Sequence, residues 1–227
     1  MKEAALHYSW TVSLVGSFTT LATALQLAIK TGNHTASKTV CLKIFQWGGV
    51  GRKPTDPSRV WLEGIAGANN LVQRLRVARR VLHPLRIIRL SMFHRVGLLM
   101  NAAMTKVYAA SDPQNIIIYD GRVGAALCLL VREFLSAKCY SEVPADLAFL
   151  WGPPQKGPTG MRNPSTEQYI FKSLNQYGVN DQQRAETARR ANRVLSAMLA
   201  NLKATGVVVP LPEVEKSLFM IGYNVRG

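Results

Sequence analysis

The chain has 227 residues, of which 48% are hydrophobic and 18% charged, a balance that supports a folded core and excludes an intrinsically disordered protein. Lysine and arginine outnumber the acids by 28 to 13, which gives a formal net charge of +15. Because this self-repulsion does not help folding, the excess charge predicts a polyanionic partner, nucleic acid or an anionic membrane, rather than a merely soluble basic protein.

Apolar periodicity and turn residues predict a mainly α fold, a helical array with few or no strands. We expect helices over about 3–30 (in one or two pieces), 58–67, 69–82, 85–100, 104–110, 120–134 and 181–204, and a shorter apolar run over 40–47. Residues 116–119 fit either a short strand or an extended linker, 151–165 fit a loop, and 207–209 a short extended piece. We expect a single unit with two helical lobes, about 1–95 and 96–227, and a cleft between them.

The membrane and metal alternatives are weaker. The uncharged stretch 10–29 is interrupted by Ser, Thr and Gln, so a buried helix is expected there rather than a membrane span or signal peptide. The three cysteines are widely spaced and form no CxxC pair, which indicates a reducing compartment and no zinc or iron–sulfur site. We therefore expect a cytoplasmic protein without metal, cofactor or obligate protein partner.

A long stretch of the chain carries positive charge alone. From Glu63 to Asp112 no further acid occurs, whereas there are seven arginines and one lysine. Solvated helix faces normally mix signs, and arginine holds phosphate bidentately. The predicted DNA contacts in this stretch are Arg76, Arg79, Arg80 and Arg95. The glycine-rich segment 48–54 adds Arg52 as a phosphate contact, although a flexible turn explains that segment equally well.

Two charged residues stand at predicted helix starts, Lys106 and Asp120. If they converge, the helix N-termini would also direct free N–H groups at an anionic backbone. A carboxylate can stabilise the positive charge that develops on a sugar as its glycosidic bond breaks. A desolvated lysine amine can attack C1′ and form a Schiff base. The simpler alternatives are a helix cap for Asp120 and a phosphate contact or solvent-facing position for Lys106.

Residues 95–135 resemble the helix-hairpin-helix DNA glycosylases, especially the 8-oxoguanine glycosylase branch. Thr105-Lys106-Val107 matches the family's Thr-Lys-Val, and Asp120 matches the aspartate that opens its next helix. The family's hairpin turn is glycine-rich, whereas this chain has 101–104 (Asn-Ala-Ala-Met) there. The resemblance implies a helix-hairpin-helix array that flips a damaged or modified base out of duplex DNA and excises it.

The resemblance leaves mechanism and biological role open. If Lys106 is the nucleophile, the enzyme is also an AP lyase; if water attacks beside Asp120, the strand stays intact. Bacterial relatives of this type suggest a role in phage defence as well as in repair. The alternative is a non-enzymatic helical protein that binds DNA or RNA. A nuclease is a weaker third hypothesis, because no PD-(D/E)xK, HNH or paired-carboxylate motif occurs.

The remaining candidates are loop donors and aromatic residues. The further predicted DNA contacts are Arg122, Arg162, Asn163 and Ser165. For Ser165 the alternative is a capped turn that starts a helix. Trp47 and Trp151 stand beside glycine-rich loops, so each is a candidate wall for a base pocket, although tryptophan is more often a core residue.

Overall fold

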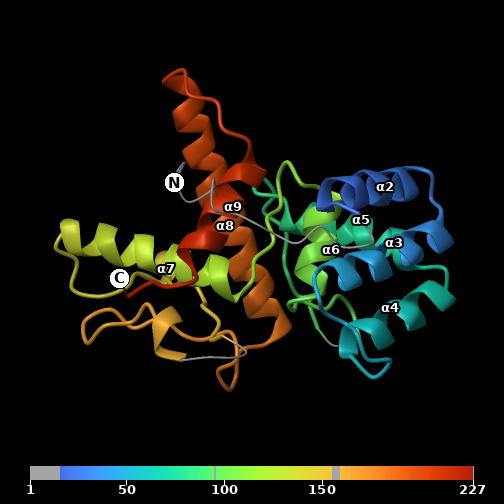
Figure 1. The fold of residues 1–227 in the computed structure, drawn as a ribbon, viewed down its shortest axis with the longest axis horizontal. Helices are drawn as coiled ribbons and strands as arrows, with labels where there is room; N and C mark the ends of the chain where they lie inside the picture. Colours follow the sequence, from blue (N-terminus) through green and yellow to red (C-terminus); the bar gives the residue numbers. More distant parts are fainter. Residues whose placement is uncertain (1–15, 95, 155–158, 227) are drawn as a thin grey trace. The chain divides into compact units, whose positions relative to one another are not determined.

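The computed structural model describes residues 16–94, 96–154 and 159–226. These residues confirm the mainly α fold: they form eight α-helices, two short 3-10 turns and no sheet (Figure 1). The helices are α2 (Phe18–Lys30), α3 (His34–Trp47), α4 (Pro57–Gly67), α5 (Leu71–Leu82), α6 (Met104–Ser111), α7 (Gly121–Ala137), α8 (Asp181–Ala204) and α9 (Leu211–Ile221), with η1 (Ala145–Leu147) and η2 (Thr159–Arg162).

Most predicted helices occur where the periodicity placed them. The ranges 58–67, 69–82, 104–110 and 181–204 correspond to α4, α5, α6 and α8. The predicted helix over 3–30 is described only in part; its described part, α2, starts at the Ser17 cap and ends at Thr31, before Gly32 with φ +71°. The apolar run over 40–47 is the second half of α3, which begins earlier because Asn33 caps it.

The predicted helix over 85–100 is wrong. Beyond Pro84 the described residues up to Ala103 form turns and irregular backbone, and Leu85 and Ile87 are 79% and 95% exposed. These two side chains are apolar but face water, so they form no buried helical face. The carbonyls of this segment bind arginines of α8 instead: Arg189 donates to Ile88 O, and Arg193 donates to Pro84 O at 3.1 Å.

Two other segments differ from the sequence expectations. Residues 116–119 form a buried linker without a strand partner among the described residues, which settles them as linker. Residues 207–209 lead directly into α9, a helix that the sequence analysis did not predict. Its buried apolar positions are Leu211, Val214 and Leu218, spaced three and four apart on one helical face.

The chain divides into two compact units made of interleaved stretches, rather than lobes on either side of residue 95. Unit 1 contains the described residues within 119–179 and 197–227, and unit 2 those within 16–118 and 180–196. In unit 2, helices α2, α3, α5 and α6 pack on one another (Figure 1), and the buried side chains between them are rich in leucine. In unit 1, α7 packs against α9.

Candidate functional site

Helix α6 in unit 2 is buried along its whole length. All eight of its residues are buried, including Lys106 with a relative exposure of 7%. Its neighbours fix it from several sides: Tyr108 Oη donates to Leu99 O at 2.8 Å, and Gln26 Nε2 to Ala110 O at 3.4 Å. The candidate lysine is therefore held inside unit 2 rather than displayed on its surface.

The Lys106 side chain occupies a niche that a glycine makes possible. A Cβ atom built on Gly48, the C-cap of α3, would lie 2.4 Å from Lys106 Cδ and 2.7 Å from Cε. At the end of the side chain, Nζ donates to Ala102 O at 2.9 Å. Lys106 thus satisfies a carbonyl in the turn just before its own helix while its aliphatic stem packs on the end of α3.

An asparagine holds the turn that leads into α6. Asn101 Oδ1 accepts from the backbone N–H groups of Ala103 and Met104, each at 3.1 Å, and from Ser58 Oγ at 3.0 Å. The close turn lies farther upstream, at Gly97, where a Cβ atom would be 2.3 Å from Met92 O. Sequence reasoning missed this role of Asn101, although asparagine side chains commonly bind backbone N–H groups in turns.

The segment after α3 brings two predicted residues close to the niche. Trp47 directly precedes Gly48, and its ring lies 4.7 Å from that of Phe18 at 37°. Arg52, four residues further on, is exposed and lies over the backbone of Gly49. Trp47 is therefore a half-buried packing residue at the end of α3, whereas Arg52 remains available to a partner.

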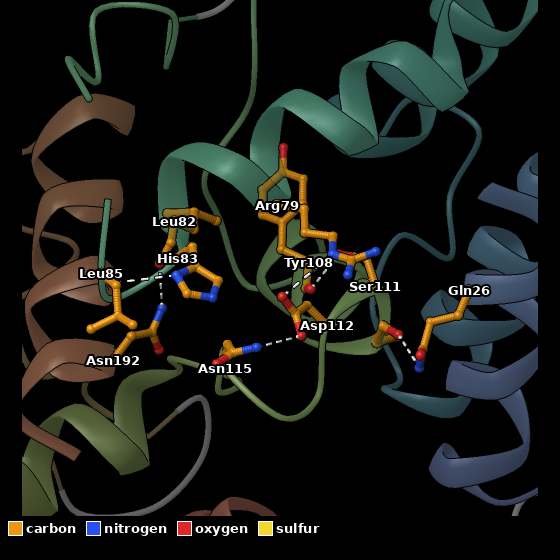
Figure 2. A network of polar contacts seen from close by, with 11 residues as sticks. Gln26, Arg79, Leu82, His83, Leu85, Tyr108, Ser111, Asp112, Asn115 and Asn192 are labelled. Carbon is orange, nitrogen blue, oxygen red and sulfur yellow. Dashed lines mark hydrogen bonds and ion pairs between the residues drawn. The ribbon is translucent and has the colours of Figure 1, made fainter. Parts of the chain in front are cut away.

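The arginines predicted to bind DNA from α5 differ in what they contact. Arg76 donates to Ile29 O at 2.7 Å, which closes the end of α2. Arg79 Nε lies 3.3 Å from the buried carboxylate of Asp112, which also accepts from Asn115 (Figure 2). Arg80 is exposed, and Arg95 lies outside the described residues. Arg76 and Arg79 thus support the packing of unit 2, whatever else they bind.

Asp120 caps α7 in unit 1 with one oxygen of its carboxylate. Oδ1 accepts from Arg122 N at 2.9 Å and from Val123 N at 3.1 Å. Oδ2 makes no hydrogen bond to any described residue. The cap expected as a structural role for Asp120 is therefore present, and it leaves the second oxygen available.

The start of α7 is held firmly by close backbone contacts. A Cβ atom on Gly124 would lie 2.1 Å from Leu150 O, and one on Gly121 would lie 2.8 Å from Gly152 Cα. Immediately before the helix, Tyr119 Oη donates to Leu150 O at 2.7 Å. The backbone that carries Asp120 is thus fixed against residues 150–152 of the same unit.

Two arginines lie in the same electrostatic environment as Asp120. The guanidinium of Arg122 packs against two rings of α9 and its C-terminal turn, with Cζ 4.4 Å from the Phe219 ring centroid and 3.8 Å from that of Tyr223. Its Nη1 is buried without a hydrogen-bond partner among the described residues. Burial and then the charge of Arg122 lower the pKa of Arg162, while the charge of Asp120 and Tyr223 act in the opposite direction.

The loop residues predicted as donors mostly fold the loop itself. Asn163 Oδ1 accepts from Ser165 N at 3.0 Å, and Ser165 Oγ accepts from Phe171 N at 3.0 Å. Trp151 Nε1 donates to Phe171 O, also at 3.0 Å. No helix starts at Ser165, so that alternative is wrong; the serine closes a loop on the buried Phe171 instead.

Unit 1 thus brings together Asp120, Arg122 and Arg162, and unit 2 brings Lys106 to the segment 47–52. The convergence of Lys106 with Asp120 stays a prediction, because the two residues belong to different units. Sequence reasoning missed Phe219 and Tyr223 because it missed α9. The signal for that helix was present in Pro212 and Glu213, residues typical of a first helical turn.

No family model, curated protein or solved structure matches the chain. None of the helices in the described part is both long and apolar enough to cross a membrane.

Proposed function

We propose that the protein binds DNA and excises a damaged or modified base from it, with Asp120 as the catalytic carboxylate. The observation that carries this proposal is that the two carboxylate oxygens of Asp120 differ in their contacts. One oxygen is fixed by two backbone N–H groups, and the other has no described partner. Charged oxygen atoms fixed in this way need no reorganisation when positive charge develops nearby.

Asp120 would act as the glycosidic bond breaks. Charge develops on the sugar as the base departs, and Oδ2 would stabilise it or accept a proton from the attacking water. The neighbouring Arg122 and Arg162 supply positive charge for the phosphates on either side of a flipped nucleotide.

The position of Lys106 favours water over lysine as the nucleophile. Its Nζ donates to Ala102 O and its stem fills the niche at Gly48, so attack on C1′ would require it to leave both contacts. Burial is nevertheless a property of Schiff-base lysines. The lysine nucleophile therefore remains the alternative mechanism within this proposal.

The test is Asp120→Asn in a base-release assay. The substrates are duplexes containing 8-oxoguanine, uracil or glucosylated 5-hydroxymethylcytosine, beside unmodified duplex. We expect wild type to release one of these bases and Asp120→Asn to lose about 100-fold or more of that rate, while asparagine preserves the cap. Asp56→Asn, the same change before α4, is the matched control and should keep full activity.

Borohydride added to the same reactions separates the two mechanisms. With water as nucleophile no covalent protein–DNA adduct forms, and the product is an intact strand with an abasic site. A trapped adduct that disappears in Lys106→Gln would establish the lysine mechanism instead. Absence of base release by wild type from all substrates would reject the assignment of these activities.

Non-enzymatic DNA or RNA binding is the second candidate, and the capping bonds of Asp120 favour it, because they already give the residue a structural purpose. Under that hypothesis Asp120→Ala lowers the melting temperature through loss of the cap, about 1 kcal/mol of stability. Wild type would then bind nucleic acid and release no base.

A further inference from the structure

A hollow on the surface of unit 2 is lined by three cations. It has a volume of about 660 Å³ and lies along α3, the segment 48–53 and the start of α4. We call it the basic groove and define it by Lys43, Arg52 and Arg59, with Thr39 and Gln46 as polar neighbours and Phe45 among its apolar residues. None of its lining residues is acidic.

Two of the three cations are uncommitted. Lys43 and Arg52 are exposed and make no hydrogen bond or ion pair with any described residue. Arg59 pairs with Glu63 one turn along α4, at 3.1 Å. Arg76 and Arg79, by contrast, contact other residues of unit 2 and support its packing. Holding uncompensated cations around one hollow costs stability through repulsion, which an anionic ligand would relieve.

The glycine-rich segment beside the groove has a fixed conformation and is not a flexible turn. Gly49 and Gly51 have φ values of +65° and +59°, a region that other residues rarely adopt. A Cβ atom on Gly51 would lie 2.8 Å from the Phe45 ring, and one on Gly48 would strike Lys106. The segment that carries Arg52 is therefore packed on both sides, against α3 and against the buried lysine of α6.

We propose that the basic groove binds a phosphate group of a nucleic-acid backbone, with Lys43 and Arg52 as its principal contacts. The proposal rests on the proposed function for the identity of the polymer, since a free nucleotide offers the same phosphate chemistry. Arg52 can hold phosphate oxygens with its planar fork, Lys43 adds a point charge, and Thr39 and Gln46 add neutral donors.

The experiment compares two double variants that remove the same charge. Lys43→Gln with Arg52→Gln alters the groove, whereas Lys38→Gln with Lys53→Gln alters the same helix and the same segment outside the lining. The affinity of each for a duplex DNA oligonucleotide is measured over a range of salt concentrations by fluorescence anisotropy. We expect the log–log salt slope of the groove variant to fall in magnitude by about 0.9, because the contact with one phosphate is lost. The control should keep the slope of wild type.

Equal slopes for the two double variants would overturn the proposal, because affinity would then follow net charge and not the groove. Titration with deoxyadenosine monophosphate tests the source of the phosphate. Micromolar binding that duplex DNA does not displace would make the groove a free-nucleotide site and overturn the assignment to nucleic acid. A groove-dependent slope without base release would leave this inference standing and reject the glycosylase. Base release lost in Asp120→Asn, with equal slopes, would do the reverse.

Discussion

The starts of α6 and α7 are both held by glycines, but the two contacts differ in kind. At α6, Gly48 accommodates a side chain, that of Lys106, whereas at α7, Gly124 accommodates the backbone carbonyl of Leu150. The charged ends also differ. Lys106 Nζ is bound to a carbonyl next to its own helix, while Asp120 keeps one oxygen without a described partner. The comparison indicates that the first helix start is built for packing and the second for rigid presentation of a carboxylate.

The largest expected effect is on the α7 side. Gly124→Ala places a Cβ atom 2.1 Å from Leu150 O, and backbone cannot move aside as a side chain can. We expect a loss of about 3 kcal/mol or more in the free energy of unfolding, larger than the ~1 kcal/mol that alanine gains in a helix interior. Urea denaturation followed by circular dichroism measures the difference.

Gly64→Ala is the matched control for that variant. Gly64 lies inside α4 and a Cβ atom there meets nothing within 4 Å, so the substitution should stabilise the protein by up to about 1 kcal/mol. If Gly124→Ala were neutral or stabilising, the contact between α7 and residues 150–152 would not be the rigid support that the comparison assigns to it.

A smaller loss of stability is expected for a substitution at Gly48, which contacts Lys106 of α6. Unlike the loss at Gly124, it should depend on a second side chain. Gly48→Ala meets Lys106 Cδ, which can shift at the expense of its packing, and should cost about 1–2 kcal/mol. In a Lys106→Ala background the obstacle is gone, so the same substitution should cost at least ~1 kcal/mol less. A double-mutant cycle of unfolding free energies measures this coupling. Strict additivity would mean that Gly48 and Lys106 do not share the niche.

Sequence analysis succeeds for some elements of this fold and fails for others. The helices with long apolar stripes and standard caps were predictable, since α7 follows an aspartate cap and α8 matches its predicted range of 181–204. The segment 85–100 was not predictable, because its apolar residues Leu85 and Ile87 suggest a core helix but are exposed. Tertiary hydrogen bonds from α8 arginines, invisible in local sequence, decide its conformation.

The candidate site shows the same division. The aspartate at a helix start was recognisable from residue type and position, and its cap is present. The partner of each charged side chain was not recognisable. Nothing in the local sequence distinguishes Arg52 from Arg76. One lies uncommitted at the basic groove, and the other donates to Ile29 O at the end of α2. Counting charges therefore predicted a polyanionic partner without separating structural arginines from available ones.

The smallest expected effect uses one buried thiol in each unit as a reporter. Cys41 lies on α3 in unit 2 and Cys128 on α7 in unit 1, and both are fully buried. Burial raises the pKa of Cys41 to about 12 and raises that of Cys128 as well, so neither is a thiolate near pH 8. In wild type, we expect N-ethylmaleimide to label the exposed Cys139 first, as followed by peptide mass spectrometry.

The two glycine variants should then label different cysteines. Buried thiols react through local opening, so a loss of local stability speeds labelling by roughly tenfold for each ~1.4 kcal/mol. Gly48→Ala should accelerate labelling of Cys41 more than that of Cys128, and Gly124→Ala should do the opposite, because each substitution strains its own unit. Equal acceleration of both thiols in both variants would mean that the protein opens as one cooperative body. The two helix starts could then no longer be treated as independently supported, and the contrast between a packed lysine and a presented aspartate would have to rest on their contacts alone.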